Sequence, residues 1–266
     1  MANESAAAPI VSIVIVSFNA HRDLERCLAS LYAHPPAAAH EIVVVDNGST
    51  DRSVETARRW RGVKVIDNRA NLGFARATNI GIRASHGANL LLLNSDTVVP
   101  AGAIDRLLDE LDRDAGVAVV GPRLVDGSGR AELSFGRMIG PLNELRQQRV
   151  ARGDVDRLTR ERRYPDWVSG ACLLVRRVEA EAAGLLDERF FMYTEDVDFC
   201  AAIRARGRRV LFAPEVEVQH LRGRSVAAAP AATQQAYRRS QIAFYQKHHP
   251  RWAPLLRAYL WLRGAR

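Results

Sequence analysis

The chain has 266 residues, 47% of them hydrophobic and 26% charged, which is a globular composition and excludes a disordered, fibrous or collagen-like protein. Its formal net charge is +8, and nine of its 38 Lys and Arg lie within residues 221–266, where no Asp or Glu occurs. Residues 1–220 therefore carry 29 basic against 30 acidic residues. The surplus positive charge belongs to a C-terminal tail, which does not favour a nucleic-acid footprint spread over the folded body.

Cysteine use and the N-terminus bear on the compartment. Cys27, Cys172 and Cys200 are widely spaced and form no CxxC pair, so they indicate neither a disulfide framework nor a zinc knuckle. The segment MANESAAAPI has no basic stretch before an apolar run, and no apolar run reaches the roughly 18 residues of a spanning helix. We expect a cytoplasmic protein, with peripheral attachment to the inner face of the plasma membrane left open.

Strand and helix patterns alternate through the first hundred or so residues. Short apolar, β-branched runs predict buried strands, and apolar residues spaced by three and four predict helices between them. The strands are expected at 11–16, 42–45, 63–66 and 90–93, and the helices at 24–31, from a cap at Ser49 or Asp51 through Trp60, and at 75–84. This alternation predicts an α/β fold with a doubly wound, mostly parallel sheet covered by helices on both faces.

The second half of the chain is less regular. Strands are expected at 117–125, 167–175 and 210–218, a turn at 126–129, a helix at 195–206 with Thr194 as its N-cap, and tail helices at 231–247 and 252–263. Residues 135–165 form a long Arg-rich stretch with weak periodicity, and such loops are usually functional or mobile. Neither an internal repeat nor a domain linker is found.

Polar clusters follow three of the first four predicted strands. They are Ser17-Phe18-Asn19, Asp46-Asn47-Gly48 and Asn94-Ser95-Asp96. Such residues are common in ordinary turns, but ligands of open α/β sheets bind beyond the carboxyl ends of the strands. Three clusters on one edge therefore predict a polar ligand site.

The motifs have a specific resemblance. VIVSFN (14–19), VVDNGSTD (44–51), NLGFA (71–75), LLNSD (92–96) and EDVD (195–198) resemble the family 2 glycosyltransferases of the GT-A fold, over about residues 11–225. The segment FMYTEDVDFC (191–200), with His220 and Ser225 after it, resembles the bacterial rhamnosyltransferase branch, whose members use dTDP-L-rhamnose or a related nucleotide sugar.

This resemblance implies a function and a domain plan. The function is inverting transfer of L-rhamnose from a dTDP- or UDP-sugar to a hydroxyl of a glycan or lipid-linked glycan, with Mg²⁺ or Mn²⁺ and a carboxylate base. The expected GT-A domain covers 1–225, with a flexible start at 1–10, a nucleotide-binding half at 11–96 and an acceptor-binding half at 97–225. A basic helical tail follows at 226–266. No oligomeric state is indicated.

The donor site is expected at the first loops. A carboxylate at the end of the second strand can accept the imide N–H of uracil or thymine, which makes Asp46 a candidate, with turn formation as the alternative. The full predicted set of nucleotide-sugar-binding residues is Ser17, Asn19, Asp46, Gly73, Arg76, Asn79, Ser95 and Asp96. For Arg76, a plain surface position is the alternative.

The metal is expected at Asn94-Ser95-Asp96, which stands where the family has Asp-x-Asp and keeps an acid only at its last position. Divalent cations prefer oxygen ligands and neutralise a leaving diphosphate. Asp96 is therefore the predicted main ligand. His220 resembles a further metal or diphosphate ligand, with a structural histidine as the alternative.

Glu195 and Asp196 are the candidate catalytic residues. Acids at a helix start are favoured by the helix dipole, but the apolar run 190–193 before them also suits a sugar face and would raise a pKa by desolvation. The resemblance implies that Asp196 takes the acceptor hydroxyl proton and that Glu195 orients the acceptor. It also implies an acceptor-binding group formed by Trp167, Ser169, Gly170 and Tyr193, with a core position as the alternative for Trp167.

The tail has two interpretations. Trp252, Leu255, Leu256, Tyr259, Leu260 and Leu262 form an apolar stripe flanked by Arg251, Arg257, Arg263 and Arg266. This pattern is typical of an interfacial helix on anionic lipid, and the alternative is a helix packed back on the domain.

The sequence suggests two alternative functions, and neither is favoured. A basic nucleic-acid-binding protein without catalytic activity is the alternative that the net charge suggests, but the near-neutral body does not favour it and no nucleic-acid partner is expected. A nicotinamide-dependent enzyme would need GxGxxG after the first strand, and Ser17-Phe18-Asn19-Ala20 does not supply it.

Overall fold

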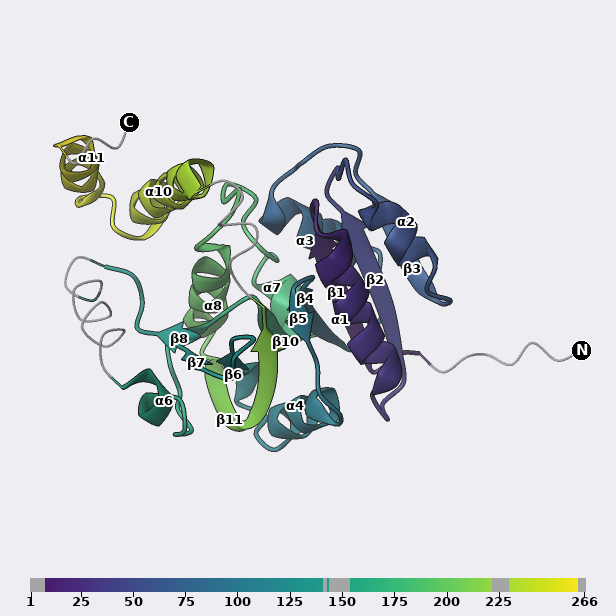
Figure 1. Cartoon of the computed structure of the whole chain (residues 1–266). Coiled ribbons are helices and arrows are strands. Elements are labelled where there is room, and N and C mark those ends of the chain that lie inside the picture. The colour runs from purple at the N-terminus through teal and green to yellow at the C-terminus, as the bar shows by residue number, and fades with distance from the viewer. Residues whose placement is uncertain (1–7, 141–142, 144–153, 222–229, 263–266) are drawn as a thin grey trace, which may run out of the picture.

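A nine-stranded sheet forms the centre of the computed structural model, which describes residues 8–140, 143, 154–221 and 230–262. The strand order is β3-β2-β1-β4-β10-β6-β11-β5 with β7 paired to β6, and β8 and β9 form a separate pair (Figure 1). The strands are β1 (Val11–Ser17), β2 (His40–Asp46), β3 (Val63–Asp67), β4 (Asn89–Asn94), β5 (Thr97–Val98), β6 (Val117–Val125), β7 (Ala131–Glu132), β8 (Phe135–Gly136), β9 (Trp167–Val168), β10 (Cys172–Arg176) and β11 (Arg209–His220).

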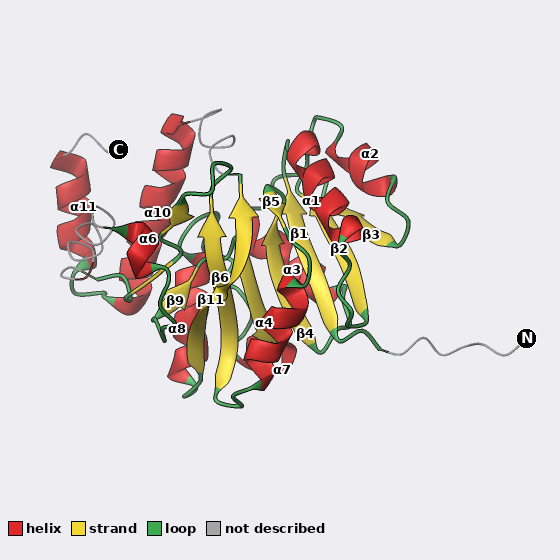
Figure 2. Cartoon of the chain, turned by 60° about the horizontal axis from the view of Figure 1, so that its bottom comes forward, coloured by secondary structure: helices red, strands yellow, loops and turns green. Residues whose placement is uncertain are grey.

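Helices cover both faces of this sheet (Figure 2). They are α1 (His21–Ala33), α2 (Ser53–Arg58), α3 (Phe74–Arg83), α4 (Ala103–Asp112), α6 (Val155–Leu158), α7 (Arg177–Ala182), α8 (Glu195–Ala205), α10 (Pro230–His248) and α11 (Ala253–Leu262). Several expectations lie partly or wholly outside the described residues: Ser225, most of the start at 1–10, the beginning of the tail, and Arg222, Arg224, Arg263 and Arg266.

Two hydrophobic clusters sandwich the sheet. Ile13 of β1 packs in the cluster that also holds buried residues of α1, α2 and α4, and its neighbour Val14 packs in the cluster with α3, α7 and α8. Side chains alternate between the faces of a strand, so a strand covered on both sides must be apolar throughout. The expected α/β fold with a mostly parallel sheet and helices on both faces is confirmed.

The expected strand at 167–175 is wrong as a single element. β9 pairs with β8 outside the main sheet, while β10 lies between β4 and β6 and runs antiparallel to both. Ser169, Gly170 and Ala171 connect the two strands. An apolar run reports burial but not its pairing direction, so the break was not visible in the hydrophobic pattern.

The predicted helix caps have different outcomes. The N-cap of α2 is Arg52, without a side-chain capping bond, so the expected cap at Ser49 or Asp51 is wrong. Asp51 Oδ1 accepts from the Ser53 N–H at 2.9 Å, and α2 ends at Arg58, two residues before the expected Trp60. Thr194 precedes α8, but its φ is +64° and its side chain makes no capping bond. Tyr193 also has a positive φ, of +71°. The chain therefore enters α8 through two adjacent left-handed residues, a conformation that side chains with a Cβ disfavour.

Helix α10 packs back on the domain. Phe244 and Tyr245 are buried in a cluster with Phe190 and Val197, and α11 adds Ala253 to the same cluster. Several large side chains around α11 nevertheless remain exposed, namely Trp252, Leu255, Tyr259, Trp261 and Leu262. The two interpretations of the tail concern residues 252–262, which include α11; this helix buries Ala253 and Leu260 and keeps an exposed apolar face. Within the described residues, no helix is both long and apolar enough to cross a membrane.

Candidate active site

Two buried polar side chains at the ends of β1 and β2 each leave one oxygen without a hydrogen-bond partner among the described atoms. Ser17 and Asp46 are register partners on adjacent parallel strands, with 0% and 1% exposure. Asp46 Oδ2 accepts from the N–H groups of Gly48 (3.1 Å) and Ser49 (2.8 Å), so turn formation holds for this oxygen. Among the described atoms, Asp46 Oδ1 and Ser17 Oγ have no partner. An unsatisfied buried polar atom costs about 1–3 kcal/mol, which a bound hydrogen-bonding ligand would relieve.

Asn19 ties the first two loops together. Its φ is +50°, its Oδ1 accepts from the Thr50 N–H at 2.8 Å, and its own N–H donates to Ser49 Oγ at 2.8 Å. These bonds hold the β1 and β2 loops side by side at the sheet edge. Contact between Asn19 and a donor stays a prediction.

Gly73 allows two segments that are distant in the sequence to lie in close contact. Its φ is +85°, and a Cβ at this position would lie 2.6 Å from the Phe191 carbonyl oxygen. The next residue, Phe74, donates its N–H to that same oxygen at 2.6 Å. Only glycine fits this contact without displacing backbone. Gly73 therefore joins the start of α3 to the loop that precedes Glu195.

Arg76 and Asn79 both face Glu188. The Asn79 amide donates to Leu186 O and Glu188 Oε1 and accepts from the Leu186 N–H, and Arg76 lies 3.8 Å from Glu188 with 57% of its side chain exposed. The buried Asn79 amide is bonded to the 186–188 segment, and its contact with a donor stays a prediction. Helix periodicity alone could not show which face of α3 this segment covers.

Asp96 and His220 form a candidate metal pair. Leu221 N–H donates to the Asp96 carbonyl oxygen at 2.8 Å, which brings the ends of β4 and β11 together. His220 Nε2 lies 3.2 Å from Asp96 Oδ1, and His220 Nδ1 lies 3.1 Å from Glu132 Oε2. Burial lowers the pKa of His220, but the hydrogen bonds to Asp96 and Glu132 outweigh this effect and raise the pKa to about 9. A cation bound at Nε2 would therefore replace a proton there. Ser95, the residue before Asp96 in the sequence, is buried.

Asp96 and His220 fit a divalent cation whose remaining ligands come from a diphosphate and water. Among the described residues, no group of three or more His, Cys, Asp or Glu side chains could hold a metal alone. Mg²⁺ and Mn²⁺ sites commonly use one or two protein ligands and complete the shell with phosphate and water. The Asp96 side chain is 24% exposed, so it can reach such a ligand.

The turn between β9 and β10 holds the Asp196 carboxylate. Gly170 N–H donates to Asp196 Oδ2 at 2.9 Å, and Val197 N–H donates to Asp196 Oδ1 at 2.8 Å. A Cβ on Gly170 would lie 3.2 Å from the Asp196 Cβ. Gly170 thus touches the candidate base directly, while Ser169 Oγ accepts from the Ala171 N–H inside the turn.

The same turn adjoins the metal loop. Asn94 N–H donates to the Ala171 carbonyl oxygen at 2.9 Å, and Leu93 is the register partner of Cys172 in the antiparallel β4–β10 pair. Asp96 lies two residues beyond Asn94, and Gly170 lies one residue before Ala171. The antiparallel insertion of β10 therefore brings the candidate metal ligand and the candidate base to one place.

Glu195 is 7% exposed, and its Oε2 has no hydrogen-bond partner among the described atoms. Burial, with the neighbouring charge of Asp196 as a second cause, raises the pKa of Glu195 well above its ordinary value. A carboxyl group in this setting favours the neutral, protonated form. The two adjacent acids are thus placed in different environments.

The remaining predicted acceptor residues lie around the helix start. Trp167 is partly buried, packs against two hydrophobic clusters and donates from Nε1 to the Arg137 carbonyl oxygen at 2.9 Å. The core alternative thus accounts for much of its ring. Tyr193 contacts Tyr237 of α10 edge to face, with ring centroids 6.0 Å apart.

Residues 12–177 match a family model described as glycosyl transferase family 2. The chain belongs to glycosyltransferase family 2. An N-acetylglucosaminyl-diphospho-decaprenol L-rhamnosyltransferase from Mycobacterium tuberculosis is 31% identical to this glycosyltransferase, over 96% of this chain and 92% of the relative. The predicted family and its likeness to rhamnosyltransferases are therefore confirmed, and the non-catalytic nucleic-acid-binding alternative is set aside.

Solved structures confirm the fold of the glycosyltransferase. A mannosyltransferase from Pyrobaculum calidifontis, in complex with GDP-Man and Mn²⁺, has a TM-score of 0.63 and 20% identity over 97% of this chain and 70% of its own. GalNAc-T7 with UDP, GalNAc and Mn²⁺ has a TM-score of 0.62 and 20% identity over 82% of this chain. The match spans only 45% of the GalNAc-T7 chain.

Sequence reasoning missed two residues of the glycosyltransferase site. Asn47, although noted in its motif, was given no role. It is 3% exposed, its Oδ1 accepts from the Leu72 N–H at 3.1 Å and its Nδ2 donates to Asn71 Oδ1 at 2.9 Å, so it fixes the loop that ends at Gly73. Glu132 was not considered, because the two-residue strand β7 gives no periodic signal. It becomes visible only through its contact with His220.

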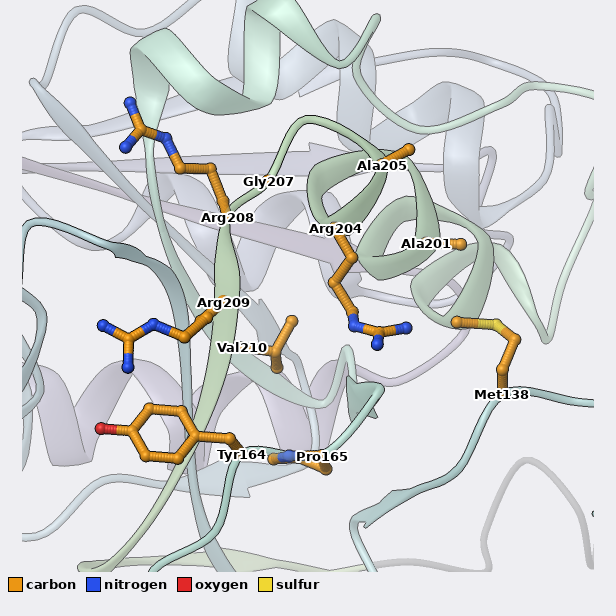
Figure 3. A pocket seen from close by; sticks show the side chains of 10 residues that line it. All are labelled: Met138, Tyr164, Pro165, Ala201, Arg204, Ala205, Gly207, Arg208, Arg209 and Val210. Carbon is orange, nitrogen blue, oxygen red and sulfur yellow. The ribbon is translucent and has the colours of Figure 1, made fainter.

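A pocket of about 630 Å³ lies near the C-terminal end of α8, away from Asp196 at the start of that helix (Figure 3). Its arginines are already paired: Arg204 with Asp166, Arg208 with Glu179, and Arg209 with Asp114. These cations are therefore not available as an unpaired set for a diphosphate, and we do not place the donor here.

Proposed function

We propose that this glycosyltransferase is an inverting rhamnosyltransferase that moves L-rhamnose from a dTDP- or UDP-linked donor to a hydroxyl of a lipid-linked glycan. The mycobacterial L-rhamnosyltransferase, which is 31% identical over 96% of this chain, supports the sugar and the acceptor class. The main observation behind the proposed reaction is the hydrogen bond from Asn94 N–H to Ala171 O, because it places the Asp96 loop next to the turn that holds Asp196.

The nucleotide base is proposed to occupy the ends of β1 and β2. Asp46 Oδ1 is a buried acceptor without a partner among the described atoms, and a pyrimidine imide N–H is a suitable donor to it. Ser17 Oγ, which can donate or accept a hydrogen bond, also lacks a partner among the described atoms. A base that presents an acceptor to Asp46 would leave both groups unsatisfied, which favours uracil or thymine.

Asp96 and His220 are proposed to hold Mg²⁺ or Mn²⁺. When bound, the cation would neutralise negative charge on the diphosphate as it leaves. The solved relatives with Mn²⁺ support a divalent ion in this fold. Glu132 would orient His220 from the opposite ring nitrogen, the usual arrangement behind a histidine ligand.

Asp196 is proposed as the base. The acceptor oxygen forms a bond to the anomeric carbon while the bond from that carbon to the diphosphate oxygen breaks, and the hydroxyl proton passes to the Asp196 carboxylate. The backbone donors Gly170 and Val197 fix both carboxylate oxygens, so little reorientation is needed before proton transfer. Glu195, buried and favoured in its neutral form, is proposed to orient the acceptor without competing for that proton.

Purified protein tests this proposal when it is mixed with dTDP-L-rhamnose, Mg²⁺ or Mn²⁺, and a short-chain polyprenyl-diphosphate N-acetylglucosamine. Mass spectrometry should detect one added deoxyhexose, and NMR should show inversion at the anomeric carbon. UDP-glucose and GDP-mannose serve as donor controls. Transfer from either control in preference to every dTDP- and UDP-rhamnose donor would contradict the proposed sugar.

The exposed face of α11 is proposed to rest on the cytoplasmic surface of an anionic membrane, where a lipid-linked acceptor would be found. Leu255, Tyr259 and Trp261 are 61%, 50% and 67% exposed, and residues 221–266 hold nine basic residues and no acid. Apolar and aromatic side chains beside Arg suit the interface of an anionic bilayer.

Vesicle flotation tests the membrane proposal. The variant Leu255→Gln/Tyr259→Gln/Trp261→Gln should lose binding to vesicles that contain phosphatidylglycerol. Tyr164→Gln, which changes a residue 52% exposed on another part of the surface, should bind as the unmodified chain does. Equal flotation of the triple variant would remove the membrane proposal and leave the transferase proposal in place.

A further inference from the structure

The basic tail contacts the helix that carries the candidate base. Figures 1 and 2 both place α10 next to α8. At the contact, Lys247 Nζ lies 2.8 Å from Asp198 Oδ2, and His248 Nε2 lies 2.6 Å from Asp198 Oδ1. Asp198 has 2% of its side chain exposed and stands two residues after Asp196, in the first turn of α8. Both oxygens of this buried carboxylate therefore meet cationic or hydrogen-donating groups of α10.

Lys247 also joins α8 to the segment before it. Its Nζ lies 2.8 Å from Asp187 Oδ2. One ammonium group therefore bridges Asp187, at the start of the segment that leads into α8, and Asp198, in the first turn of that helix. Burial lowers the pKa of Lys247, but the bonds to Asp187 and Asp198 raise it overall, which keeps the ammonium charged. A buried carboxylate requires such a partner, since an unpaired charge in this position is costly.

Two further contacts hold the middle of this segment. Ser240 Oγ donates to the Met192 carbonyl oxygen at 2.7 Å, and Phe244, fully buried, packs in the cluster that holds Phe190 and Val197. The segment ends in the left-handed residues Tyr193 and Thr194. Such a conformation persists only where surrounding contacts determine it, and α10 supplies three of these contacts.

We propose that α10 is a positioning element of the active site, in which Asp198, Lys247 and His248 fix the 187–194 segment and the first turn of α8 and so hold Asp196 against Gly170. The inference rests on the proposed role of Asp196 as base. It makes the tail a part of the catalytic structure on its α10 side, independent of any lipid contact by α11. Asp198, Lys247 and His248 are positioning residues, because they act through Asp196.

The test compares Lys247→Met with two matched variants. Lys247→Arg keeps the cation, and Arg239→Met removes an exposed cation elsewhere on α10. Because small displacements of a reacting group are costly to turnover, kcat of Lys247→Met should fall roughly tenfold or more. The donor KM should stay within about twofold, since the donor is proposed to bind at the ends of β1, β2 and β4, whereas Lys247 pairs with Asp187 and Asp198. Lys247→Arg should restore most of the turnover, and Arg239→Met should resemble the unmodified chain.

Hydrogen exchange measured by mass spectrometry gives a readout independent of turnover. In Lys247→Met, peptides from residues 187–200 should exchange faster, while those from β1, β2 and β4 should be unchanged. Ser240→Ala, which removes the bond to Met192 without altering charge, should shift the same peptides to a smaller degree.

Three outcomes would overturn the inference. The first is normal kcat with unchanged exchange in Lys247→Met, and the second is an equal loss in Arg239→Met. The third is faster exchange throughout the chain, which would mean that Lys247 supports global stability only. Asp196→Asn is measured in parallel: if it retains turnover, the proposed base is wrong, whereas the exchange data still report whether α10 holds the 187–194 segment.

Discussion

Gly170 donates its backbone N–H to Asp196 Oδ2 at 2.9 Å. Two segments 26 residues apart in the chain meet in this bond, and a methyl group on Gly170 would lie 3.2 Å from the Asp196 Cβ, close enough to require a small shift. The orientation of the proposed base therefore depends on the turn between β9 and β10 as well as on its own helix.

Asp196→Asn should abolish transfer and leave nucleotide binding intact. The amide keeps the shape of the carboxylate but cannot accept the hydroxyl proton, and loss of a general base commonly costs about 10²- to 10⁴-fold in rate. Turnover with the lipid-linked acceptor and calorimetric affinity for dTDP measure the two effects. Near-normal turnover would show that another group takes the proton.

Gly170→Ala tests the hold on that carboxylate. The added methyl group should displace Asp196 by a few tenths of an ångström, so we expect kcat to fall by roughly tenfold. Melting temperature and dTDP affinity should change little. Retained kcat would mean that the turn adjusts without moving Asp196, and Ser169→Ala in the same turn is the matched control.

Asp46→Asn should weaken donor binding. A hydrogen bond to a charged group contributes about 1.5–3 kcal/mol, which corresponds to about 10- to 100-fold in Kd. The comparison is the affinity of each variant for dTDP and UDP by calorimetry. Glu188→Gln, in the cluster with Asn79 and Arg83, should leave that affinity unchanged. Unaltered dTDP and UDP binding in Asp46→Asn would exclude the proposed base pocket.

Asp96→Ala should reduce the gain in nucleotide affinity that Mg²⁺ or Mn²⁺ provides. Titration of dTDP with and without each metal, and after chelation by EDTA, measures this gain. The variant without metal should resemble the unmodified chain without metal. If the metal still strengthens binding equally, Asp96 is not the main ligand.

Glu195 gives the chain a pH-dependent stability. Its folded-state pKa is raised by burial and by the charge of Asp196, so above the unfolded-state value the folded chain holds a proton that the unfolded chain releases. Stability at this group is therefore lost as pH rises above about 4.5. Glu195→Gln should melt higher than the unmodified chain near neutral pH, by about 2–4 °C per kcal/mol, and the difference should vanish toward pH 4. A constant difference across this range would contradict the raised pKa.

Much of the fold was predictable because burial leaves a local mark. The strand expected at 117–125 is β6 with the same bounds, and the strand at 11–16 is β1 with one more residue. The strand at 167–175 failed, since the pattern of Trp167 through Val175 is apolar on both sides of Gly170. The division of the domain at residue 96 stays a prediction.

The candidate site divides in the same way. Motif residues at strand ends, such as Asp46 and Asp96, were predictable because parallel strands deliver their loops to one edge. The bonds of Asn79 to the 186–188 segment and the contact of Glu132 with His220 were not predictable, because each joins residues about 90 or more positions apart. The contacts of Lys247 and His248 with Asp198 left no pattern in the sequence of the tail.

By itself, the sequence determined the α/β class, the glycosyltransferase family and the chemical groups available at the sheet edge, because these follow from local periodicity and short motifs. It also located the surplus positive charge in the tail. Only the tertiary structure decided that β10 enters the sheet antiparallel and sets Gly170 on Asp196, and that Lys247 of the tail pairs with Asp198. Such pairings join distant segments, so they depend on packing and charge neutralisation in the folded chain.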